Sequence, residues 1–247
     1  MAKTIAVIGA NGFVGSEICK AVDASNFYSS AKHLVKISRN SPHKCYIDGS
    51  DIVIHSANPA GRYIAENYPA KDFDESVEKT AWFLKISKGK KFVLISSLSC
   101  RTQLDTNYGR NRRACELMVL KAGGTVIRLG PMFGGNRKKD MLHDILAGRD
   151  VHIGVDSRYA YVDVAWNAKQ VVELAELITG AHLLIELGAC NSVRLGDIRN
   201  YFGSNSKFLG ADEHQEPDPN LLWNHGPNAN DVYVYAQKEM IEICQKS

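Results

Sequence analysis

The feature that most constrains the fold is a glycine-rich turn between an apolar strand and an amphipathic helix at the start of the chain. Residues Thr4–Ile8 form a short apolar run rich in β-branched side chains, which indicates a buried strand. Gly9, Gly12 and Gly15 follow at a spacing of three, and apolar residues then recur at helical spacing. A strand, a glycine turn and a helix in this order predict the first βα unit of a parallel α/β sheet.

Each glycine of this turn has a separate physical reason. Gly9 allows the sharp turn after the strand, Gly12 allows close approach of the backbone to a pyrophosphate, and Gly15 allows the helix to pack against the strand. The helix N-terminus then offers free N–H groups and the positive end of its dipole to phosphate. We therefore expect dinucleotide binding, and the alternative is a glycine turn without a ligand. The predicted cofactor-binding residues here are Gly9, Asn11, Gly12, Phe13, Val14 and Gly15.

The second predicted strand bears on the choice between NAD and NADP. It covers Leu34–Ser38 and is followed by Arg39. An acidic residue at this strand end would accept a hydrogen bond from the 2′-hydroxyl of NAD, whereas an arginine accommodates the 2′-phosphate of NADP. Ser38 and Arg39 stand there without an acid, so the sequence favours NADP, with NAD possible. The alternative is that Arg39 is an ordinary surface residue.

The third strand region is unusually short. Asp51–His55 reads as another buried strand, only about a dozen residues after Arg39, and Cys45–Ile47 is a candidate vestigial strand between them. We expect a sheet trimmed in this region, with a missing or very short third helix. Ser56, Ala57 and Asn58 follow the strand at its carboxyl end, where open parallel sheets bind ligands, and their small side chains leave room for the nicotinamide half of a dinucleotide.

Candidate catalytic residues follow the next strand. A helix is predicted over Lys71–Lys88, with Gly89 as its stop, and a buried strand over Phe92–Ile95. Ser97 and Ser99 come directly after that strand, at an edge where they can meet a substrate, although polar loop residues are the alternative.

A further helix begins at Tyr108. Arg112 lies four residues after Tyr108, so the two side chains share one helix face. A fixed cation beside a phenol favours the ionised phenol and makes it a better acid–base group near neutral pH. The alternative is an ordinary surface pair of tyrosine and arginine.

The whole pattern predicts a Rossmann-type, doubly wound α/β fold. Residues 1–130 are the expected dinucleotide-binding domain and residues 131–247 a small substrate-binding part, with 159–187 returning to the core. The remaining predicted elements are strands at 125–129, 159–164 and 183–187, and helices at 141–147, 165–178, 195–202 and 231–245, the helix at 165–178 being followed by Gly180.

Composition excludes several other classes. The net charge of +3 is too small to suggest nucleic-acid binding, and the basic run Arg137–Lys139 reads as a solvated loop. Six cysteines show no metal spacing, and no signal peptide or long apolar stretch is evident. We therefore expect a cytoplasmic protein with reduced thiols, no metal and no membrane segment.

Taken together, six motifs resemble the extended short-chain dehydrogenase/reductases, the NAD(P)-dependent epimerase/dehydratase group. GANGFVG resembles the family's GxxGxxG, and DIVIHSA its DxVxHxA strand. ISSLS is similar to the serine-bearing strand end, and YGRNRRACE to the YxxSK helix with its trailing acid. VIRLGPMFG and YAYVDVA resemble the segments that enter and leave the substrate loop.

The resemblance implies a mechanism. Tyr108 would be the general acid–base, and Ser97 would position the substrate oxygen, with Ser99 as the alternative. The family exchanges hydride between a nicotinamide cofactor and its substrate, commonly a nucleotide sugar. It often forms dimers through two helices, here 71–88 and 108–121.

Two proton-handling positions depart from the family pattern and keep other functions open, and Lys79 and Val164 replace the family's glycine and its second acid elsewhere. Arg112 stands where the family has lysine, and Ser76 where it has asparagine. The first hypothesis is an epimerase, dehydratase or reductase acting on a nucleotide sugar or a similar polar alcohol or carbonyl. The second is a non-catalytic NADP(H)-binding sensor or assembly subunit. A steroid- or flavonoid-type reductase is a third possibility, and Arg128, Arg194 and Arg199 are either diphosphate ligands or surface charges.

Overall fold

The chain forms two units, each with its own buried apolar core. The computed structural model describes residues 3–25, 33–39, 41, 43–137, 139–178, 182–223 and 226–244. The first unit comprises Met1–Leu129 and Ala165–Ile185, and the second comprises Gly130–Val164 and Glu186–Ser247. The chain therefore leaves the first unit after Leu129 and returns to it once.

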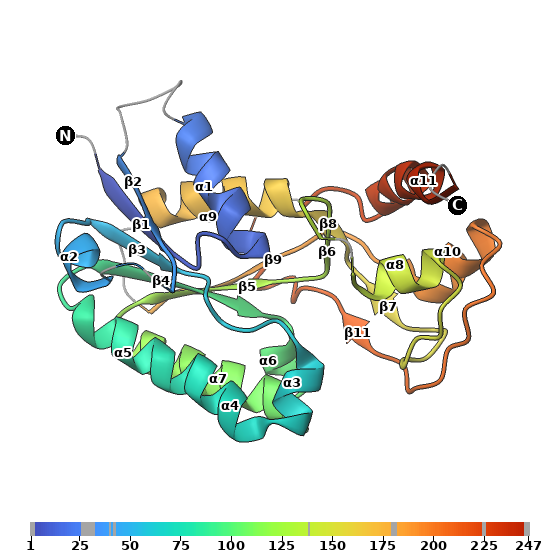
Figure 1. The fold of residues 1–247 in the computed structure, drawn as a ribbon, viewed down its shortest axis with the longest axis horizontal. Coiled ribbons are helices and arrows are strands. Elements are labelled where there is room, and N and C mark those ends of the chain that lie inside the picture. Colours follow the sequence, from blue (N-terminus) through green and yellow to red (C-terminus); the bar gives the residue numbers. More distant parts are fainter. Residues whose placement is uncertain are drawn as a thin grey trace. The chain divides into compact units, whose positions relative to one another are not determined.

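The first unit is built on a six-stranded sheet with the order β2-β1-β3-β4-β5-β9 (Figure 1). Its strands are β1 (Thr4–Ile8), β2 (His33–Ile37), β3 (Ile52–His55), β4 (Lys91–Ser97), β5 (Thr125–Leu129) and β9 (Leu184–Leu187). Strands β1 to β5 pair in parallel. The chain runs from β1 to its neighbour β2 on one side and then crosses to β3 on the other side of β1. The topological switch point therefore lies between the carboxyl ends of β1 and β3. Ligands bind at such a point in open parallel sheets.

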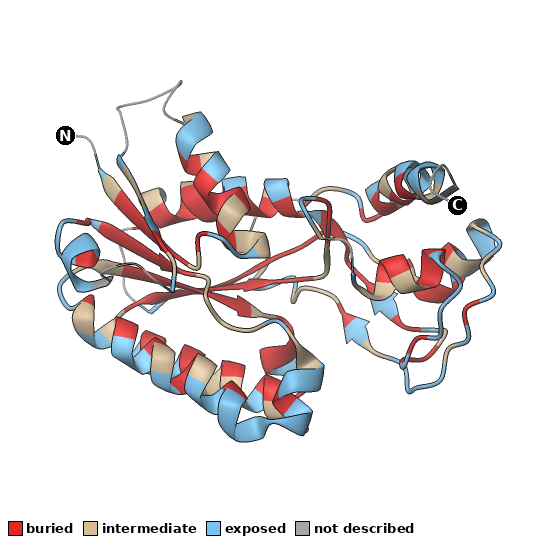
Figure 2. Cartoon of the chain, viewed as in Figure 1, coloured by how far each residue is buried: buried red, intermediate tan, exposed pale blue. Residues whose placement is uncertain are grey.

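Helices cover both faces of this sheet. Helices α1 (Phe13–Ser25) and α9 (Val164–Leu177) lie on one face (Figure 1). Helices α5 (Lys79–Ile86) and α7 (Asn107–Lys121) lie on the other. Strands β3 and β5 are buried along their whole length, as the continuous apolar runs predicted (Figure 2). The predicted Rossmann-type fold is confirmed.

The region between β2 and β3 is trimmed, as expected, but one detail of the prediction was wrong. Cys45–Ile47 is not a vestigial strand: it lies within the six-residue helix α2 (His43–Asp48). Ile47 is fully buried while Cys45 and Tyr46 are exposed, so one apolar residue in this turn is enough to hold the short helix against the core.

The helix predicted at 71–88 is interrupted by a π-helical segment. It is observed as α4 (Pro69–Phe73), a π turn η1 (Asp74–Glu78) and then α5. Two further short helices were not predicted: α3 (Arg62–Asn67) and α6 (Ser99–Thr102). Both lie beside α7, and their contacts with it shape the candidate site.

Within its described residues, the second unit contains short strands and three helices around a separate core. Its strands are β6 (Met132–Phe133), β7 (Arg158–Tyr159), β8 (Val162–Asp163), β10 (Val193–Arg194) and β11 (His214–Gln215), and its helices α8 (Met141–Leu146), α10 (Leu195–Tyr201) and α11 (Asp231–Cys244). The strand predicted at 159–164 is thus two shorter strands. Three residues of the sequence predictions lie outside the described residues. They are Lys138 of the basic loop, Gly180 after the helix predicted at 165–178, and Gln245 at the end of the helix predicted at 231–245.

Candidate functional site

The glycine turn after β1 is tight and leads directly into a helix. Gly9 has φ +85°, and a Cβ built on it would lie 2.9 Å from the Cα of Ala57. A Cβ on Gly15 would lie 2.1 Å from the carbonyl oxygen of Gly9. Gly12 N–H donates to that same carbonyl at 2.8 Å, and α1 begins at the next residue. The turn is therefore closed to side chains and opens onto a helix N-terminus, which fits a pyrophosphate group.

Ser56 joins the end of β3 to this turn. Its hydroxyl and its backbone N–H both donate to the carbonyl of Ile8, each at 3.0 Å. The Ser56 side chain is thus engaged with β1, which holds the neighbouring Ala57 under the glycine turn.

The end of β2 carries no carboxylate. Ser38 N–H donates to the hydroxyl of Ser41 at 2.9 Å, which fixes the turn that follows the strand. Arg39 is exposed and makes no ion pair with any other described residue. The pKa of Glu75 on η1 lies below its usual value mainly because Lys79 hydrogen-bonds to it, and Arg39 is among the nearby cations that lower it further.

His55, at the end of β3, is a buried neutral imidazole. Burial lowers its pKa to about 3, and the positive charges of Lys79 and Arg112 act in the same direction. Its Nδ1 accepts from Ala57 N–H at 3.4 Å, and its Nε2 lies 3.1 Å from the hydroxyl of Thr80. That hydroxyl in turn donates to Asn58 Oδ1 at 3.4 Å.

The two candidate serines lie at the carboxyl end of β4 but differ in exposure. Ser97 is half-buried, and its hydroxyl accepts from Ser99 N–H at 3.3 Å. Ser99 is 1% exposed and begins α6. The backbone after α6 lies against α7 at the residue following Tyr108, because a Cβ on Gly109 would be 1.9 Å from the carbonyl oxygen of Gln103. Ser97 is the more accessible of the two hydroxyls.

Tyr108 and Arg112 lie together on one face of α7, as predicted. The guanidinium carbon of Arg112 lies 4.6 Å from the centroid of the Tyr108 ring. Tyr108 is 8% exposed, and its hydroxyl makes no hydrogen bond to Ser97 or to any other described side chain. Thr106 caps the helix by accepting from Gly109 N–H at 3.0 Å, which fixes the first turn and with it Tyr108.

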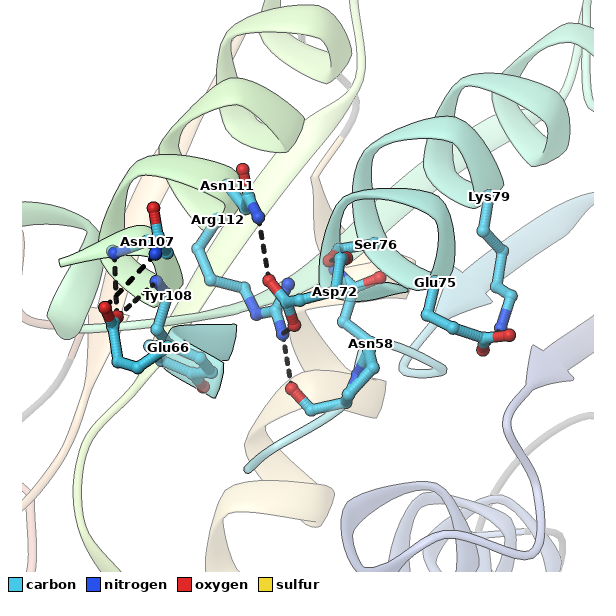
Figure 3. Close-up of polar contacts among 12 residues, drawn as sticks. Asn58, Glu66, Asp72, Glu75, Ser76, Lys79, Asn107, Tyr108, Asn111 and Arg112 are labelled. Carbon is cyan, nitrogen blue, oxygen red and sulfur yellow. Dashed lines mark hydrogen bonds and ion pairs between the residues drawn. The ribbon is translucent and has the colours of Figure 1, made fainter. Parts of the chain in front are cut away.

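The Arg112 guanidinium is held by groups that sequence analysis missed (Figure 3). Its Nη2 donates to the carbonyl oxygen of Pro59 and lies 3.4 Å from Asp72 Oδ1. Asp72 is fully buried, and its other oxygen accepts from Asn111 at 2.8 Å. Arg112 is itself 2% exposed, and its Nη1 is a buried donor without a partner among the described residues.

Helix α3 contacts the start of α7. Glu66 Oε1 accepts from Asn107 N–H at 2.8 Å and from Tyr108 N–H at 3.4 Å (Figure 3). A carboxylate at a helix N-terminus satisfies free N–H groups and complements the helix dipole. No local sequence signal marks Glu66, because its partners lie some 40 residues away in the chain.

A second buried ion pair joins α7 to β5. Glu116 is fully buried and accepts from Arg128 Nε at 2.8 Å, from Arg128 Nη2 at 2.7 Å and from the hydroxyl of Ser96 at 2.8 Å. Arg128 is therefore neither a diphosphate ligand nor a surface charge. In the second unit, Arg194 pairs with Asp156 and Asp197, and Arg199 hydrogen-bonds to Asn200.

No group of His, Cys, Asp and Glu within the described residues is arranged to hold a metal ion. Among the helices described, none combines the length and the apolar character needed to cross a bilayer.

Comparison with known proteins gives similarity at the level of structure. No family model matches the sequence, and no curated protein matches it. Among solved structures, the UDP-N-acetylglucosamine 4-epimerase from Methanobrevibacter ruminantium M1, in complex with UDP-N-acetylmuramic acid, is 15% identical with a TM-score of 0.78, covering 100% of this chain and 99% of that one.

Two further structures have related activities. UDP-glucuronic acid 4-epimerase from Bacillus cereus, with UDP-glucuronic acid and NAD, is 16% identical with a TM-score of 0.74, covering 95% of this chain and 99% of its own. An NAD-dependent NDP-hexosamine 5,6-dehydratase of tunicamycin biosynthesis is 14% identical with a TM-score of 0.65, covering 95% and 90%. The chain thus has the fold of the extended short-chain dehydrogenase/reductases, at low sequence identity, which confirms at the level of the fold the resemblance seen in its motifs.

Proposed function

We propose that this chain is an NAD(P)-dependent epimerase, dehydratase or reductase that acts on a nucleotide sugar or a similar polar alcohol or carbonyl. The observation that carries the proposal is the stacking of Arg112 over Tyr108 in the same unit as a glycine turn shaped for a pyrophosphate. The fold neighbours act on nucleotide sugars with NAD, which supports the same reaction class here.

The cofactor is proposed to lie across the carboxyl ends of β2, β1 and β3. Asn11, Gly12, Phe13 and Val14, all accessible at the start of α1, would bind the pyrophosphate. Exposed Arg39, at an edge without an acid, would bind a 2′-phosphate, so NADP is the proposed cofactor and NAD remains allowed. The cofactor supplies a site that accepts and returns a hydride.

Tyr108 is the proposed acid–base group. Its hydroxyl is free of protein partners in the part of the chain described, so it can exchange a proton with a substrate oxygen. The permanent positive charge of Arg112 beside the ring stabilises negative charge that develops on the phenol oxygen as the proton leaves. Ser97, as the more accessible serine, would position the substrate oxygen, with Ser99 as the alternative. Residues 131–247 are the proposed substrate-binding part.

One observation favours the second candidate function, a non-catalytic NADP(H)-binding sensor or assembly subunit. Arg112 directs Nη2 to Pro59 and Asp72, so part of the charge that the mechanism needs is already engaged with protein groups. Such a protein would bind the dinucleotide tightly without turnover.

The test is a fluorescence titration with NADPH and NADH, followed by assay of a panel of UDP-sugars by thermal shift and by turnover. We expect dinucleotide binding, a further shift with one UDP-sugar, and turnover that Tyr108→Phe abolishes while dinucleotide affinity is kept. Binding without turnover on any sugar would favour the sensor. Absence of dinucleotide binding would refute both functions.

A homodimer through helices 71–88 and 108–121 remains part of the proposal. Phe73, Trp82 and Leu117 on these helices are each about half exposed. Sedimentation equilibrium should show a dimer that Leu117→Glu dissociates, and a monomeric wild-type protein would refute this arrangement.

A further inference from the structure

We propose that Asn58 donates a hydrogen bond to an oxygen acceptor in the nicotinamide half of the bound dinucleotide, and that His55 and Thr80 hold its amide in the donating orientation. This inference rests on the proposed function, because it requires that the chain bind a dinucleotide. It assigns a chemical role to a polar side chain at a position where the sequence suggested only that small residues leave room.

The direction of the hydrogen bonds is set at His55. The imidazole is fully buried and packs against the rings of Phe83 and Phe92 at centroid distances of 5.1 and 6.1 Å. Since burial keeps it neutral, only one of its ring nitrogens carries a hydrogen. Nδ1 accepts from Ala57 N–H, so Nε2 carries the hydrogen and donates it to the hydroxyl of Thr80.

The Thr80 hydroxyl accepts from His55 and donates to Asn58. A hydroxyl has one hydrogen to donate and two lone pairs that accept. His55 Nε2–H occupies one lone pair, which leaves the hydrogen of the Thr80 hydroxyl to be donated. The hydroxyl hydrogen is therefore directed to Asn58 Oδ1. The amide is fixed with its oxygen toward Thr80 and its NH₂ group away from it.

The NH₂ group of Asn58 lacks an acceptor within the described structure. Asn58 Nδ2 is a buried atom without a hydrogen-bond partner, and Arg112 Nη1 is another. Arg112, on α7, donates through Nη2 to the carbonyl of Pro59, the residue next to Asn58, so both unpaired donors lie near the chain segment that follows β3 (Figure 3). Buried donors are nearly always paired in folded proteins. Two unpaired donors at one strand end indicate acceptors that arrive with a ligand.

The sheet order places these donors at the nicotinamide half. The proposed 2′-phosphate residue, Arg39, follows β2, and the glycine turn follows β1, which is the next strand. Gly9 packs on Ala57, and Asn58 is the residue directly after Ala57. Both follow β3, which is the neighbour of β1 on the side away from β2. A dinucleotide that crosses from β2 over the turn of β1 therefore presents its second half to Asn58. The acceptors in that half are ribose hydroxyl oxygens and the carboxamide oxygen.

Three ligands and a small set of variants test this inference. NADH, ADP-ribose and ADP share the adenosine diphosphate, whereas only the first two carry the second ribose and only NADH the carboxamide. We expect Asn58→Ala to weaken NADH binding about tenfold in calorimetric titration and to leave ADP binding unchanged. An equal loss with ADP-ribose identifies the ribose as the acceptor, and unchanged ADP-ribose binding identifies the carboxamide.

The orienting role of Thr80 is tested by a double-mutant cycle. Thr80→Val should weaken NADH binding in the same direction, Thr80→Ser should retain wild-type affinity, and Thr80→Val should have no further effect when Asn58 is already alanine. The matched control is Thr125→Val, because Thr125 is a buried threonine at the amino end of β5, away from the carboxyl ends of the strands where the dinucleotide is proposed to bind, and it should leave the dissociation constant unchanged.

Wild-type affinity of Asn58→Ala for NADH would overturn the inference while the proposed function stands. So would an equal loss of ADP binding, or a Thr80→Val effect that persists in the Asn58→Ala background. A wild-type protein that binds none of the three ligands would instead refute the proposed function, and this inference would fall with it.

Discussion

Replacing Glu116 by glutamine tests whether the buried ion pair with Arg128 holds the candidate site together. Glu116 joins three elements: α7, which carries Tyr108; β5, which carries Arg128; and the end of β4 at Ser96, next to Ser97. We expect Glu116→Gln to lower the free energy of unfolding by about 3–5 kcal/mol, because it leaves the Arg128 guanidinium buried without its counter-charge.

The magnitude follows from the hydrogen bonds that change. The carboxylate accepts from Arg128 Nε and Nη2, from the Ser96 hydroxyl and from Arg113 Nη1 at 3.0 Å. Glutamine keeps the shape and one acceptor oxygen, but its NH₂ group then faces donors. Losing two charge-assisted hydrogen bonds at roughly 1.5–3 kcal/mol each gives about 3–6 kcal/mol, in agreement with the value expected for a broken buried pair.

The same pair makes stability depend on pH. Burial raises the pKa of Glu116, but the hydrogen bonds and charge of Arg128 outweigh burial, so the pKa lies below its ordinary value in the folded protein. A depressed carboxylate pKa stabilises the fold above the unfolded-state pKa of roughly 4.3, and this contribution is lost as the pH falls through the folded-state pKa. The stability difference between wild type and Glu116→Gln should therefore narrow below about pH 4.

The assay is urea unfolding followed by circular dichroism, with melting temperature as a second readout. For a unit of this size, about 3–5 kcal/mol corresponds to a fall in melting temperature of roughly 6–20 °C. The matched control is Asp23→Asn, which breaks the exposed 3.8 Å ion pair with Lys36 in the same unit and should cost less than about 1 kcal/mol. A Glu116→Gln variant no less stable than this control would refute the reasoning.

Two other predictions concern the cofactor site. Gly15→Ala should abolish dinucleotide binding in the NADPH titration, because its Cβ would lie 2.1 Å from the Gly9 carbonyl oxygen. The control Gly49→Ala should leave binding unchanged, because a Cβ there meets no atom within 4 Å. Wild-type affinity of Gly15→Ala for NADPH would contradict the assigned turn. Arg39→Ala should weaken NADPH binding by about 1.5–3 kcal/mol, roughly 10- to 150-fold in the dissociation constant, and NADH binding far less, because only NADPH carries the 2′-phosphate. Equal weakening of NADPH and NADH binding would show that Arg39 is not in the site.

Most elements of the fold were predicted correctly from the sequence, because their signals lie in residues that are close together in the chain. The glycine turn, the strand Thr125–Leu129 and the helix carrying Tyr108 depend on residues close together in the chain, and the structure places them as expected. Cys45–Ile47 was misassigned because three residues cannot distinguish a strand from one helical turn, and the burial of Ile47 is decided by the core around it.

Of the contacts around Tyr108, the sequence predicted only the one that runs along α7. The i, i+4 spacing of Tyr108 and Arg112 determined their stacking, but the partners of Arg112 lie 40 and 53 residues away at Asp72 and Pro59. Helix α3, which brings Glu66 to the start of α7, carries no periodic apolar pattern that would have marked it. Contacts of this kind depend on how distant segments pack, which a single sequence does not encode in its spacing.

Arg112→Lys separates the two candidate functions, because it introduces the lysine of the family that the motifs resemble while it disturbs the packing around Arg112. An ammonium cannot reproduce the planar fork that reaches both Pro59 and Asp72, and Asp72 is fully buried. The loss of one charge-assisted hydrogen bond should reduce stability by about 1.5–3 kcal/mol, measured by urea unfolding. If the guanidinium is the cation that stabilises the phenolate, turnover should fall as well. Arg112→Met should be less stable still, because it leaves the Asp72 carboxylate buried without a counter-charge. Adding Asp72→Asn should restore part of that stability, because it removes the unpaired charge. An Arg112→Lys variant that is as stable as wild type and gains turnover would show instead that the guanidinium contacts are incidental. If the wild-type protein binds dinucleotide without turnover and Arg112→Lys restores none, the sensor is favoured.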